Sequence, residues 1–465
     1  MTKSTEPDAQ IDDLLYKKRE KIYPREVSGI FALLRNVAMV VLMGLYYGLP
    51  WLNWDGRQII LFDLPERKFY IFGATFWPQD FFYLSVILII AALSLFFFTA
   101  LAGRLWCGYA CPQTVWTEVY MLFERWIEGG RKQRMKLDKG GASFGKFRIK
   151  ATKHLVWILF SLWTGFTFVG YFTPIQELWG STLSASLGGW EAFWIVFYGF
   201  ATYGNAGFMR EQVCIYMCPY ARFQSAMFDK NTLVISYDEQ RGEPRGARKR
   251  DADPKKDGLG DCINCGLCVQ VCPTGIDIRD GLQYQCIGCA ACIDVCDEVM
   301  DKMGYPKGLV SYTTENRLAG ENTRILRPRV IVYSLLLALL TGGLIYSISV
   351  RIPLEVNILR DRNALYNETS FGLVENVYNV KILNKSENPQ SYRLSVAGLD
   401  DLQIVGPTEG IEVASGAVKD VPLRLRIDPF ALEKPSSRIT FHVESTTDPE
   451  LSVTETARFL GPARR

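Results

Sequence analysis

Two successive runs of cysteine residues constrain this chain more than any other feature. The runs are Cys262, Cys265, Cys268 and Cys272, followed by Pro273, and then Cys286, Cys289, Cys292 and Cys296. In such a pair of runs, three closely spaced sulfur atoms bind three irons of one 4Fe–4S cluster, and the fourth Cys binds the other cluster. The spacing predicts two clusters, one held by Cys262, Cys265, Cys268 and Cys296 and one held by Cys286, Cys289, Cys292 and Cys272.

A zinc site and a disulfide framework are the alternatives for such a set of cysteines. Zinc ligands usually come as two pairs of Cys or His, and disulfide frameworks are typical of small secreted domains. Here the full iron–sulfur run occurs twice. The pattern therefore favours clusters, and a protein that carries them is expected to move single electrons.

The apolar residues, 48% of a chain of 465 residues, are gathered into stretches long enough to cross a bilayer. A polar, charged tail precedes the first stretch, which is typical of a signal anchor rather than a cleaved signal peptide. We therefore predict an integral membrane protein in contact with lipid, with spans at about Ile30–Leu52, Phe81–Gly103, His154–Phe172, Trp190–Phe208 and Val330–Val350.

The distribution of charge predicts the orientation. Basic residues are concentrated in residues 17–25, 131–153 and 241–256, whereas the loop Thr173–Gly189 contains no Lys or Arg. By the positive-inside rule the N-terminus is cytoplasmic, and five crossings place the C-terminus outside. All 12 Cys lie between Cys107 and Cys296, on the side that this topology makes reducing. The expected location is the bacterial inner membrane, and the net charge of +3 is too small to suggest a nucleic-acid partner.

The segment after the fifth span is predicted to be all-β. Apolar and polar residues alternate with period two, and turn-forming residues separate the segments. About a hundred residues with this rhythm suggest an immunoglobulin-like sandwich without its disulfide, which would serve for docking. The predicted strands are Val377–Leu383, Ser391–Val396, Val421–Ile427, Arg438–Val443 and Leu451–Phe459.

The predicted fold class is thus a multidomain membrane protein. A five-helix transmembrane bundle carries an inserted cytoplasmic double-cluster ferredoxin domain and a C-terminal all-β immunoglobulin-like sandwich. The predicted domains are a cytoplasmic tail (1–29), transmembrane helices 1–4 (30–240), the ferredoxin domain (241–328), transmembrane helix 5 (329–350) and a periplasmic domain (351–465).

Four further cysteines form a repeated motif, C-x-Y-x-C-P, beyond the second and fourth spans. The two copies are Cys107–Pro112 and Cys214–Pro219, and each follows an Arg (Arg104, Arg210) expected at the membrane edge. Arg35, near the end of the first span, is expected to snorkel toward the interface. The repeat predicts that Cys107, Cys111, Cys214 and Cys218 lie together about a pseudo-twofold axis.

The proline of each motif suggests a helix start. If the motif itself is helical, its spacing of four puts both thiols of a pair on one face. Alternatively, because Pro is tolerated in the first helical turn, Pro112 and Pro219 open new helices over Gln113–Trp126 and Tyr220–Phe228, with Cys111 and Cys218 at their N-termini. A helix N-terminus and a nearby Arg both favour thiolate over thiol. Soft sulfur ligands, with Met121, Met209 and Met217 available, suit Cu(I). Structural zinc and simple packing of buried thiols remain alternatives for these cysteines.

The combination of features resembles the cytochrome c oxidase accessory protein family called CcoG, FixG or RdxA. The resemblance covers nearly the whole chain, and its most specific stretch is Cys262 to Met303, CINCGLCVQVCPTGIDIRDGLQYQCIGCAACIDVCDEVMDKM. The C-x-x-x-C-P motifs are shared more widely, with membrane ferredoxins of the NapH and NosR types. Asp297 stands where general bacterial ferredoxins have Pro, which would affect exposure or potential of a cluster but removes no ligand.

The resemblance implies a role in assembling cbb3-type cytochrome c oxidase, by reduction of Cu(II) to Cu(I). Copper would then be the substrate, bound at Cys107, Cys111, Cys214 and Cys218. Copper chaperones or exporters and oxidase assembly factors would be partners, while the electron donor is unknown and a homodimer stays open. Two alternatives have other mechanisms: a quinol-linked electron-transfer subunit for another respiratory enzyme, and a non-catalytic copper chaperone or assembly scaffold.

Overall fold

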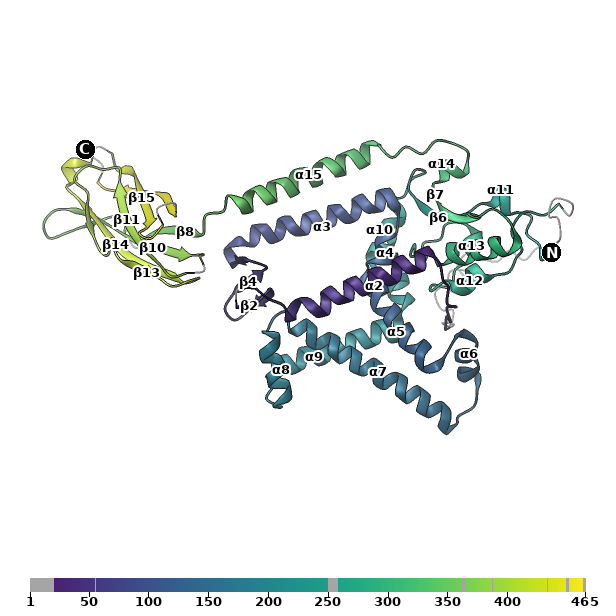
Figure 1. Cartoon of the computed structure of the whole chain (residues 1–465). Coiled ribbons are helices and arrows are strands. Elements are labelled where there is room, and N and C mark those ends of the chain that lie inside the picture. The colour runs from purple at the N-terminus through teal and green to yellow at the C-terminus, as the bar shows by residue number, and fades with distance from the viewer. Residues whose placement is uncertain are drawn as a thin grey trace, which may run out of the picture. The chain divides into compact units, whose positions relative to one another are not determined.

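Among the residues that the structure describes, three helices are long and apolar enough to cross a membrane. They are α2 (Ile30–Gly48), extended by the 3-10 turn η1 (Leu49–Trp51), α3 (Phe81–Ala102) and α15 (Pro328–Ser349). This computed structural model describes residues 21–54, 56–249, 258–361, 364–386, 388–432, 434–448 and 451–462, and the chain forms two units, Met1–Thr341 and Gly342–Arg465 (Figure 1). Each 22-residue helix reaches about 33 Å, enough for a bilayer core. The predicted basic residues 17–19 and 250–256 lie outside the described residues.

The other two predicted spans fall on helices of a different character. Residues 154–172 lie mostly on α7 (Phe144–Val169), and residues 190–208 lie on α9 (Gly189–Thr202) and its π-helical continuation η3 (Tyr203–Met209). These helices lack the combination of length and apolar composition that marks the other three as candidate membrane spans. They pack very closely, because a Cβ atom at Gly165 would lie only 2.2 Å from the carbonyl oxygen of Ile195. Such small-residue contacts are typical of helix pairs in membranes.

The links between these helices contain elements that sequence analysis did not predict. Between α2 and α3 lie β1 (Asn53–Trp54), β2 (Arg57–Gln58), β3 (Ile60–Asp63), β4 (Lys68–Ile71), β5 (Ala74–Phe76) and η2 (Pro78–Asp80). Between α7 and α9 lies α8 (Ile175–Leu183). Gln58 joins the two links, because its side chain donates to the Gly170 carbonyl (2.7 Å) and accepts from the Ile175 amide (2.9 Å).

Shorter helices lie at the ends of the long helices that are away from these links. They are α4 (Leu105–Tyr109), α5 (Pro112–Glu128), α6 (Arg131–Lys139), the π-helix η4 (Val213–Met217) and α10 (Pro219–Met227). All four cysteines of the repeated motif lie in or at the ends of these elements.

The cysteine-rich segment is flanked along the chain by two strands, β6 (Val234–Tyr237) and β7 (Val310–Thr313), which pair to form an antiparallel sheet. Thus β6 lies before residue 241, the predicted start of the ferredoxin domain. The core of this cysteine-rich domain includes buried Ile235, Ile293, Met300 and Leu309. Its helices are α11 (Glu239–Gly242), α12 (Leu267–Val271), η5 (Ile278–Asp280), α13 (Ala291–Met303) and α14 (Glu315–Leu318).

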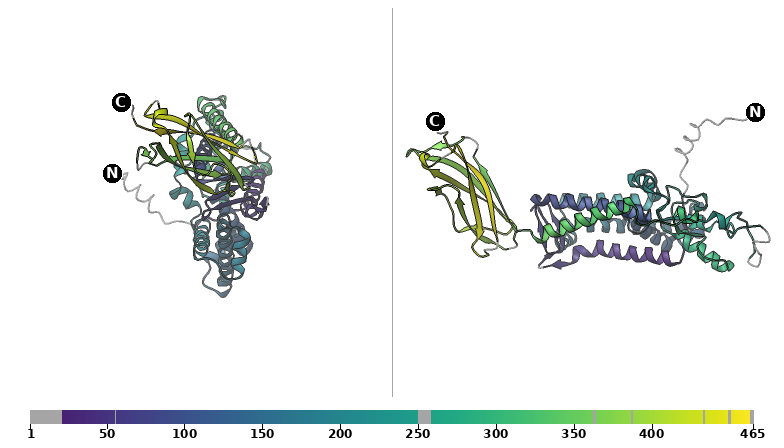
Figure 2. Two further views of the ribbon diagram at one scale, coloured as in Figure 1. Left: turned by 90° about the vertical axis from the view of Figure 1, so that its left-hand side faces the viewer. Right: turned by 90° about the horizontal axis from the view of Figure 1, so that it is seen from above.

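The second unit is a sandwich of two antiparallel sheets, whose two layers are visible in Figure 2. One sheet has the order β12 (Gln403–Val405), β14 (Val418–Ile427), β10 (Val374–Asn384), β8 (Leu354–Arg360), with β9 (Asn367–Glu368) paired to β10. The other has the order β13 (Ile411–Val413), β11 (Gln390–Ala397), β15 (Ser436–Ser445), β16 (Ser452–Leu460), and η6 (Pro429–Ala431) precedes β15.

Alternating residues of the two sheets fill the core of this sandwich. Tyr378, Val380, Leu423, Phe441 and Val443 are fully buried, as the period-two pattern requires. All five predicted strands are present. The prediction missed β8, β9, β12 and β13, of which β9, β12 and β13 have only two or three residues each.

The contact between α7 and α9 generates the first testable prediction. Replacing Gly165 with Ala would push the helices apart and cost about 1–3 kcal/mol through overpacking. We expect a lower thermal midpoint for the detergent-solubilised protein. Gly145→Ala, on the same helix with no atom within 4 Å of its added methyl group, is the control and should be neutral or stabilising. Equal midpoints for the two variants would contradict this packing.

Candidate functional site

The four cysteines predicted to hold the first cluster surround one cavity. Cys262, Cys265, Cys268 and Cys296 all line it, together with apolar side chains that include Val295 and Leu309. Cys262 is buried, whereas Cys265 is exposed to solvent. The structure therefore brings these four residues together, with Cys265 at the outer surface of the site.

The four cysteines predicted to hold the second cluster surround another cavity. Cys272, Cys286, Cys289 and Cys292 line it, together with Ile235, Ile276, Ile278 and Ile287. Burial raises the pKa of the Cys289 thiol to about 12. A thiol in this apolar environment keeps its proton unless a metal replaces it.

The backbone of each loop is shaped to enclose a cluster. Asn264 (φ 54°) and Gly266 (φ 65°) flank Cys265, while Gly288 (φ 69°) and Ala290 (φ 58°) flank Cys289, and all four are left-handed. Alternation of left- and right-handed residues turns successive amide groups toward one point and forms the concave nests that hold anionic Fe–S sites. The two cavities and their cysteines thus fit 4Fe–4S clusters, with the same local geometry in both loops.

The two copies of the C-x-x-x-C-P motif also share their local geometry. Gly103 (φ 54°, ψ −116°) and Arg210 (φ 43°, ψ −112°) end the preceding helices four residues before Cys107 and Cys214. Cys111 and Cys218 then cap α5 and α10, each with Pro at the first helical position. The prediction that Pro112 and Pro219 open helices is therefore confirmed.

Crossed hydrogen bonds hold the two motifs against each other. Gln113 of α5 donates to the carbonyl of Arg210 (3.1 Å), and Arg104 donates to the carbonyl of Ala221 in α10 (2.6 Å). The Cys107 thiol lies 3.4 Å from the Gln224 side chain of α10. Each motif thus contacts the helix that the other motif opens.

The four motif cysteines lie in one region, but two of their thiols are not activated. Burial and neighbouring Cys111 raise the pKa of Cys107 to about 12 and outweigh the attraction of Arg104. Burial, Cys111 and Cys218 raise the pKa of Cys214 to about 11. For these two thiols, which do not cap a helix, desolvation exceeds the effect of one buried Arg.

The motif cysteines do not form a closed four-sulfur site. Among the residues that the structure describes, no three Cys, His, Asp or Glu are arranged to hold one metal ion. The same holds for the ferredoxin cysteines, because each sulfur atom of a 4Fe–4S site binds a different iron. Structural zinc, which takes four closed ligands, stays an open alternative at the motif.

The loop of the second cluster rests directly on the first motif. A Cβ atom at Gly108 would lie 2.7 Å from the carbonyl oxygen of Gly288 and 3.0 Å from the Cα atom of Cys289. Arg104 also donates to the carbonyls of Tyr284 and Cys286. The two sulfur sites are therefore in backbone contact, with a buried guanidinium beside them.

Arg35 takes part in the same contact. Its guanidinium donates to the carbonyl oxygen of Cys289. The expectation that Arg35 snorkels to the membrane interface is therefore wrong, since a backbone carbonyl of the cluster loop satisfies it instead. Asp294 of α13 reinforces the joint, because its carboxylate accepts from the backbone amides of Phe31 (3.2 Å) and Ala32 (2.7 Å) in the first turn of α2.

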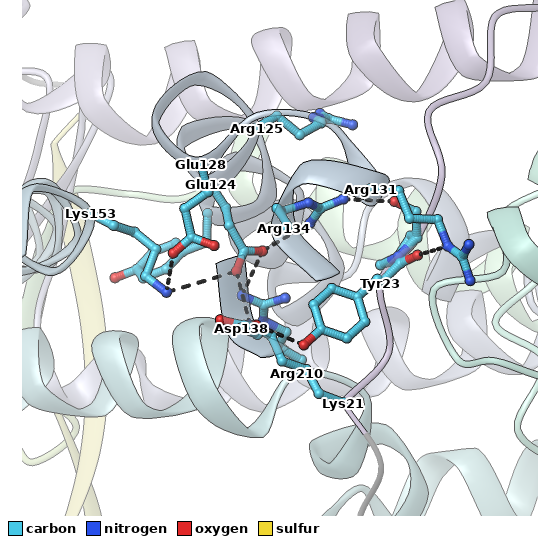
Figure 3. Close-up of polar contacts among 12 residues, drawn as sticks. Lys21, Tyr23, Glu124, Arg125, Glu128, Arg131, Arg134, Asp138, Lys153 and Arg210 are labelled. Atoms are coloured by element: carbon cyan, nitrogen blue, oxygen red, sulfur yellow. Dashed lines mark hydrogen bonds and ion pairs between the residues drawn. The ribbon is translucent and has the colours of Figure 1, made fainter. Parts of the chain in front are cut away.

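A buried ion network anchors the second motif to the helix that follows the first (Figure 3). Glu124 of α5 is fully buried, and its carboxylate lies 3.1 Å from Arg134 and 3.2 Å from Arg210. Lys153 of α7 lies 2.9 Å from Glu128, the next acid along α5. Burial alone would raise the pKa of Glu124, but Arg210 and the surrounding Lys21, Lys153 and Arg134 outweigh it and hold the pKa below its ordinary value.

Sequence analysis missed Glu124, although a signal exists. Glu124 and Glu128 are four residues apart, so they share the helix face that Tyr120 and Met121 bury. A pair of acids on the apolar face of an amphipathic helix predicts buried cationic partners. Which cations these are depends on how α5, α6 and α7 pack, which the sequence does not contain.

The network generates the second prediction. Glu124→Gln keeps the shape of the side chain but leaves Arg134 and Arg210 without their counter-charge, which costs about 3–5 kcal/mol for a buried pair. We expect a large fall in the thermal midpoint of the solubilised protein. Because the pKa of Glu124 is lowered on folding, its contribution is complete at neutral pH and is lost only as the pH falls below about 4.3.

The control for this prediction is Glu118→Gln. Glu118 is on the same helix, is partly exposed and lies 3.3 Å from Arg125. An exposed pair of this kind contributes about 1 kcal/mol or less. If both variants melted at the same temperature, the buried network would not stabilise the site.

Three parts of the chain match known protein families. Residues 209–315 match a family described as a 4Fe-4S dicluster domain, and residues 84–129 match one described as a 4Fe-4S binding domain. Residues 344–462 match the immunoglobulin-like fold at the C-terminus of FixG. The chain therefore combines iron–sulfur domains with an immunoglobulin-like all-β region.

Three related proteins are similar over most of the chain. RdxB of Cereibacter sphaeroides is 42% identical over 86% of this chain and 86% of its own. FixG of Rhizobium meliloti is 39% identical (86% and 84%), and RdxA of C. sphaeroides is 38% identical (89% and 94%). A crystal structure of a FixG-related protein from Vibrio parahaemolyticus is 32% identical over 23% of this chain and 95% of its own, with a TM-score of 0.22. By these relatives, the chain belongs to the FixG/RdxA family of iron–sulfur redox proteins.

Proposed function

We propose that this protein is a membrane-bound cupric reductase, which reduces Cu(II) to Cu(I) for the assembly of cbb3-type cytochrome c oxidase. The observation that carries the proposal is the backbone contact between the loop of Cys286 and Cys289 and the motif of Cys107 and Cys111. A site for single electrons thus adjoins soft sulfur ligands with no other domain between them.

The proposed reaction transfers one electron to each copper ion. The clusters, when bound, supply electrons one at a time. Copper, the substrate, takes up one electron as Cu(II) becomes Cu(I), and the softer product binds sulfur more strongly. Cys107, Cys111, Cys214 and Cys218 would bind the product, and each thiol that does so releases a proton. The raised pKa values of Cys107 and Cys214 keep these two thiols neutral until copper arrives.

The chain's own residues have structural tasks in this reaction. Gly108 permits close approach of the two sites because it has no side chain. Arg104 holds the cluster loop and α10 together through three carbonyl groups. Glu124 and Arg210 fix the second motif relative to α5.

The proposed location is the bacterial inner membrane, with the N-terminus and the ferredoxin domain in the cytoplasm and the sandwich in the periplasm. The placement of basic residues supports this orientation, as does the absence of Cys from the sequence after residue 296. Copper exporters or chaperones and oxidase assembly factors are the proposed partners, and the sandwich would dock to one of them.

The third prediction tests the copper site. Cys→Ser replacement at positions 107, 111, 214 and 218 together should abolish Cu(I) formation and leave the EPR signals of both clusters unchanged, because the four are not among the eight cysteines that we assign to the clusters. The measurement is anaerobic: reduced protein receives Cu(II), and cluster reoxidation is compared with Cu(I) captured by a chromogenic chelator. Unchanged Cu(I) yield would contradict the proposed site.

Measurements of quinol oxidation and of oxidase assembly, beside the copper assay, separate the competing functions. A quinol-linked relay would oxidise quinol and ignore copper, and a scaffold would support oxidase assembly even when Cys265→Ser removes a cluster ligand. A copper reductase fails both in vitro and in assembly when that ligand is removed.

The fourth prediction tests the contact between the two sites. Gly108→Ala should displace the Gly288–Cys289 loop and slow electron transfer to copper by about tenfold or more, since small misplacements have large kinetic effects. The cluster content should not change. Gly130→Ala, whose added methyl group has no neighbour within 4 Å, is the control. Equal rates in the two variants would show that electrons do not cross at Gly108.

A further inference from the structure

A cavity of about 430 Å³ lies between the second cluster site and the second motif. Its wall includes Cys289 and Ile287 from the cluster loop, Cys214 from the motif, and Met121 from α5. Ala32 and Arg35, in the first turns of α2, form another side. The volume is typical of a small-molecule site. A molecule bound there would touch both sulfur sites.

The wall of this cavity carries an excess of positive charge. Five arginines line it, against three glutamates, Glu26, Glu118 and Glu211. Glu26 and Glu118 both lie near one arginine, Arg125, at 3.9 and 3.3 Å. The arginines are Arg25, Arg35, Arg125, Arg134 and Arg210.

The buried arginines of the wall retain unused hydrogen-bonding capacity. Arg134 is 2% exposed and Arg210 is 7% exposed, and they share the single carboxylate of Glu124. Within the described part of the chain, the Nε atom of Arg134 is buried without a hydrogen-bond partner. This atom has almost no accessible surface, so it does not contact the contents of the cavity, and the arginines act on a bound ligand chiefly through their charge.

The charge of the wall discriminates between forms of copper. A hydrated Cu²⁺ ion would be repelled by the net positive charge of the wall, which has five guanidinium groups against three carboxylates. A copper complex whose ligand carries carboxylates would be attracted, because Arg binds carboxylates through two parallel hydrogen bonds. Cys214 and Met121 in the same wall supply the soft sulfur atoms that Cu(I) prefers.

We propose that this cavity binds copper as an anionic chelate with carboxylate ligands, and that this chelate is the form in which Cu(II) is reduced. The inference rests on the proposed cupric reductase function. One electron from the cluster site converts bound Cu(II) to Cu(I). Cu(I) leaves the oxygen ligands for sulfur at Cys214, the thiol proton goes to solvent, and the free chelator departs with its negative charge.

The fifth prediction compares copper complexes of different charge. Reduction of the anionic copper–nitrilotriacetate complex, the neutral bis-glycinate complex and the cationic bis-ethylenediamine complex is measured as kcat/KM with reduced full-length protein. We expect Arg25→Gln, at an exposed position in the cavity wall, to lower kcat/KM for the anionic complex by about tenfold and to leave the cationic complex unchanged or faster. The wild-type preference for the anion should shrink with added salt.

Arg148→Gln is the matched control, because Arg148 is an exposed arginine of α7 that does not line the cavity. It should leave all three rates unchanged. If Arg25→Gln slowed all three complexes equally, or none, the anionic chelate would be excluded while copper reduction itself would stand.

Binding without reduction separates the cavity from the reductase. The chromium(III)–ethylenediaminetetraacetate anion exchanges its ligands too slowly to lose its metal to the thiols. Calorimetry should show that it binds the wild type and binds Arg25→Gln about tenfold more weakly, whereas the tris-ethylenediamine chromium(III) cation does not bind. Failure of the anion to bind would overturn the cavity assignment even if copper is reduced, and binding with no copper reduction would overturn only the chelate's role as substrate.

Discussion

The buried carboxylate of Glu124 is the interaction on which the arrangement of this protein depends. It forms ion pairs with Arg134 of α6 and with Arg210, which precedes the second motif. Glu124 belongs to α5, the helix that Cys111 caps. One side chain thereby links both copies of the motif to the helical layer beneath them. Arg210 also has a left-handed backbone that favours glycine, and the equivalent position in the first copy is Gly103. The ion pair therefore holds a strained residue where the sequence repeat would otherwise call for glycine.

The redox sites follow from this anchoring. The second cluster loop contacts the membrane helices through Arg35, Arg104 and Gly108. The first cluster site is lined by residues from the later part of α13, such as Cys296, and by Cys265, which is exposed. The path through the protein thus has a solvent-facing end and an end that contacts the motif cysteines. This polarity suits an electron that enters from a soluble donor and leaves toward a substrate at the membrane helices.

Much of this organisation could be predicted from local patterns. The cysteine runs and the proline of each motif depend on short-range spacing, and all five predicted strands depend on period-two alternation, so each could be recognised in the sequence. The partners of Glu124, Gly108 and Arg35 could not, because they are distant in the chain. Arg35 shows the difficulty well. An arginine near the end of an apolar helix is expected to reach for lipid headgroups, yet the Cys289 carbonyl, 254 residues away, is its partner.

The unequal exposure of the two cluster sites also determines how the protein would fail in air. Dioxygen and peroxide reach accessible sulfur and iron first. Cys265 is exposed, whereas the thiols of Cys286, Cys289 and Cys292 are enclosed by apolar side chains. Oxidative damage would therefore begin at the solvent-facing cluster and leave the inner one in place. A burst of oxygen would therefore stop electrons from entering the protein before it damaged the inner cluster site, which contacts the first motif.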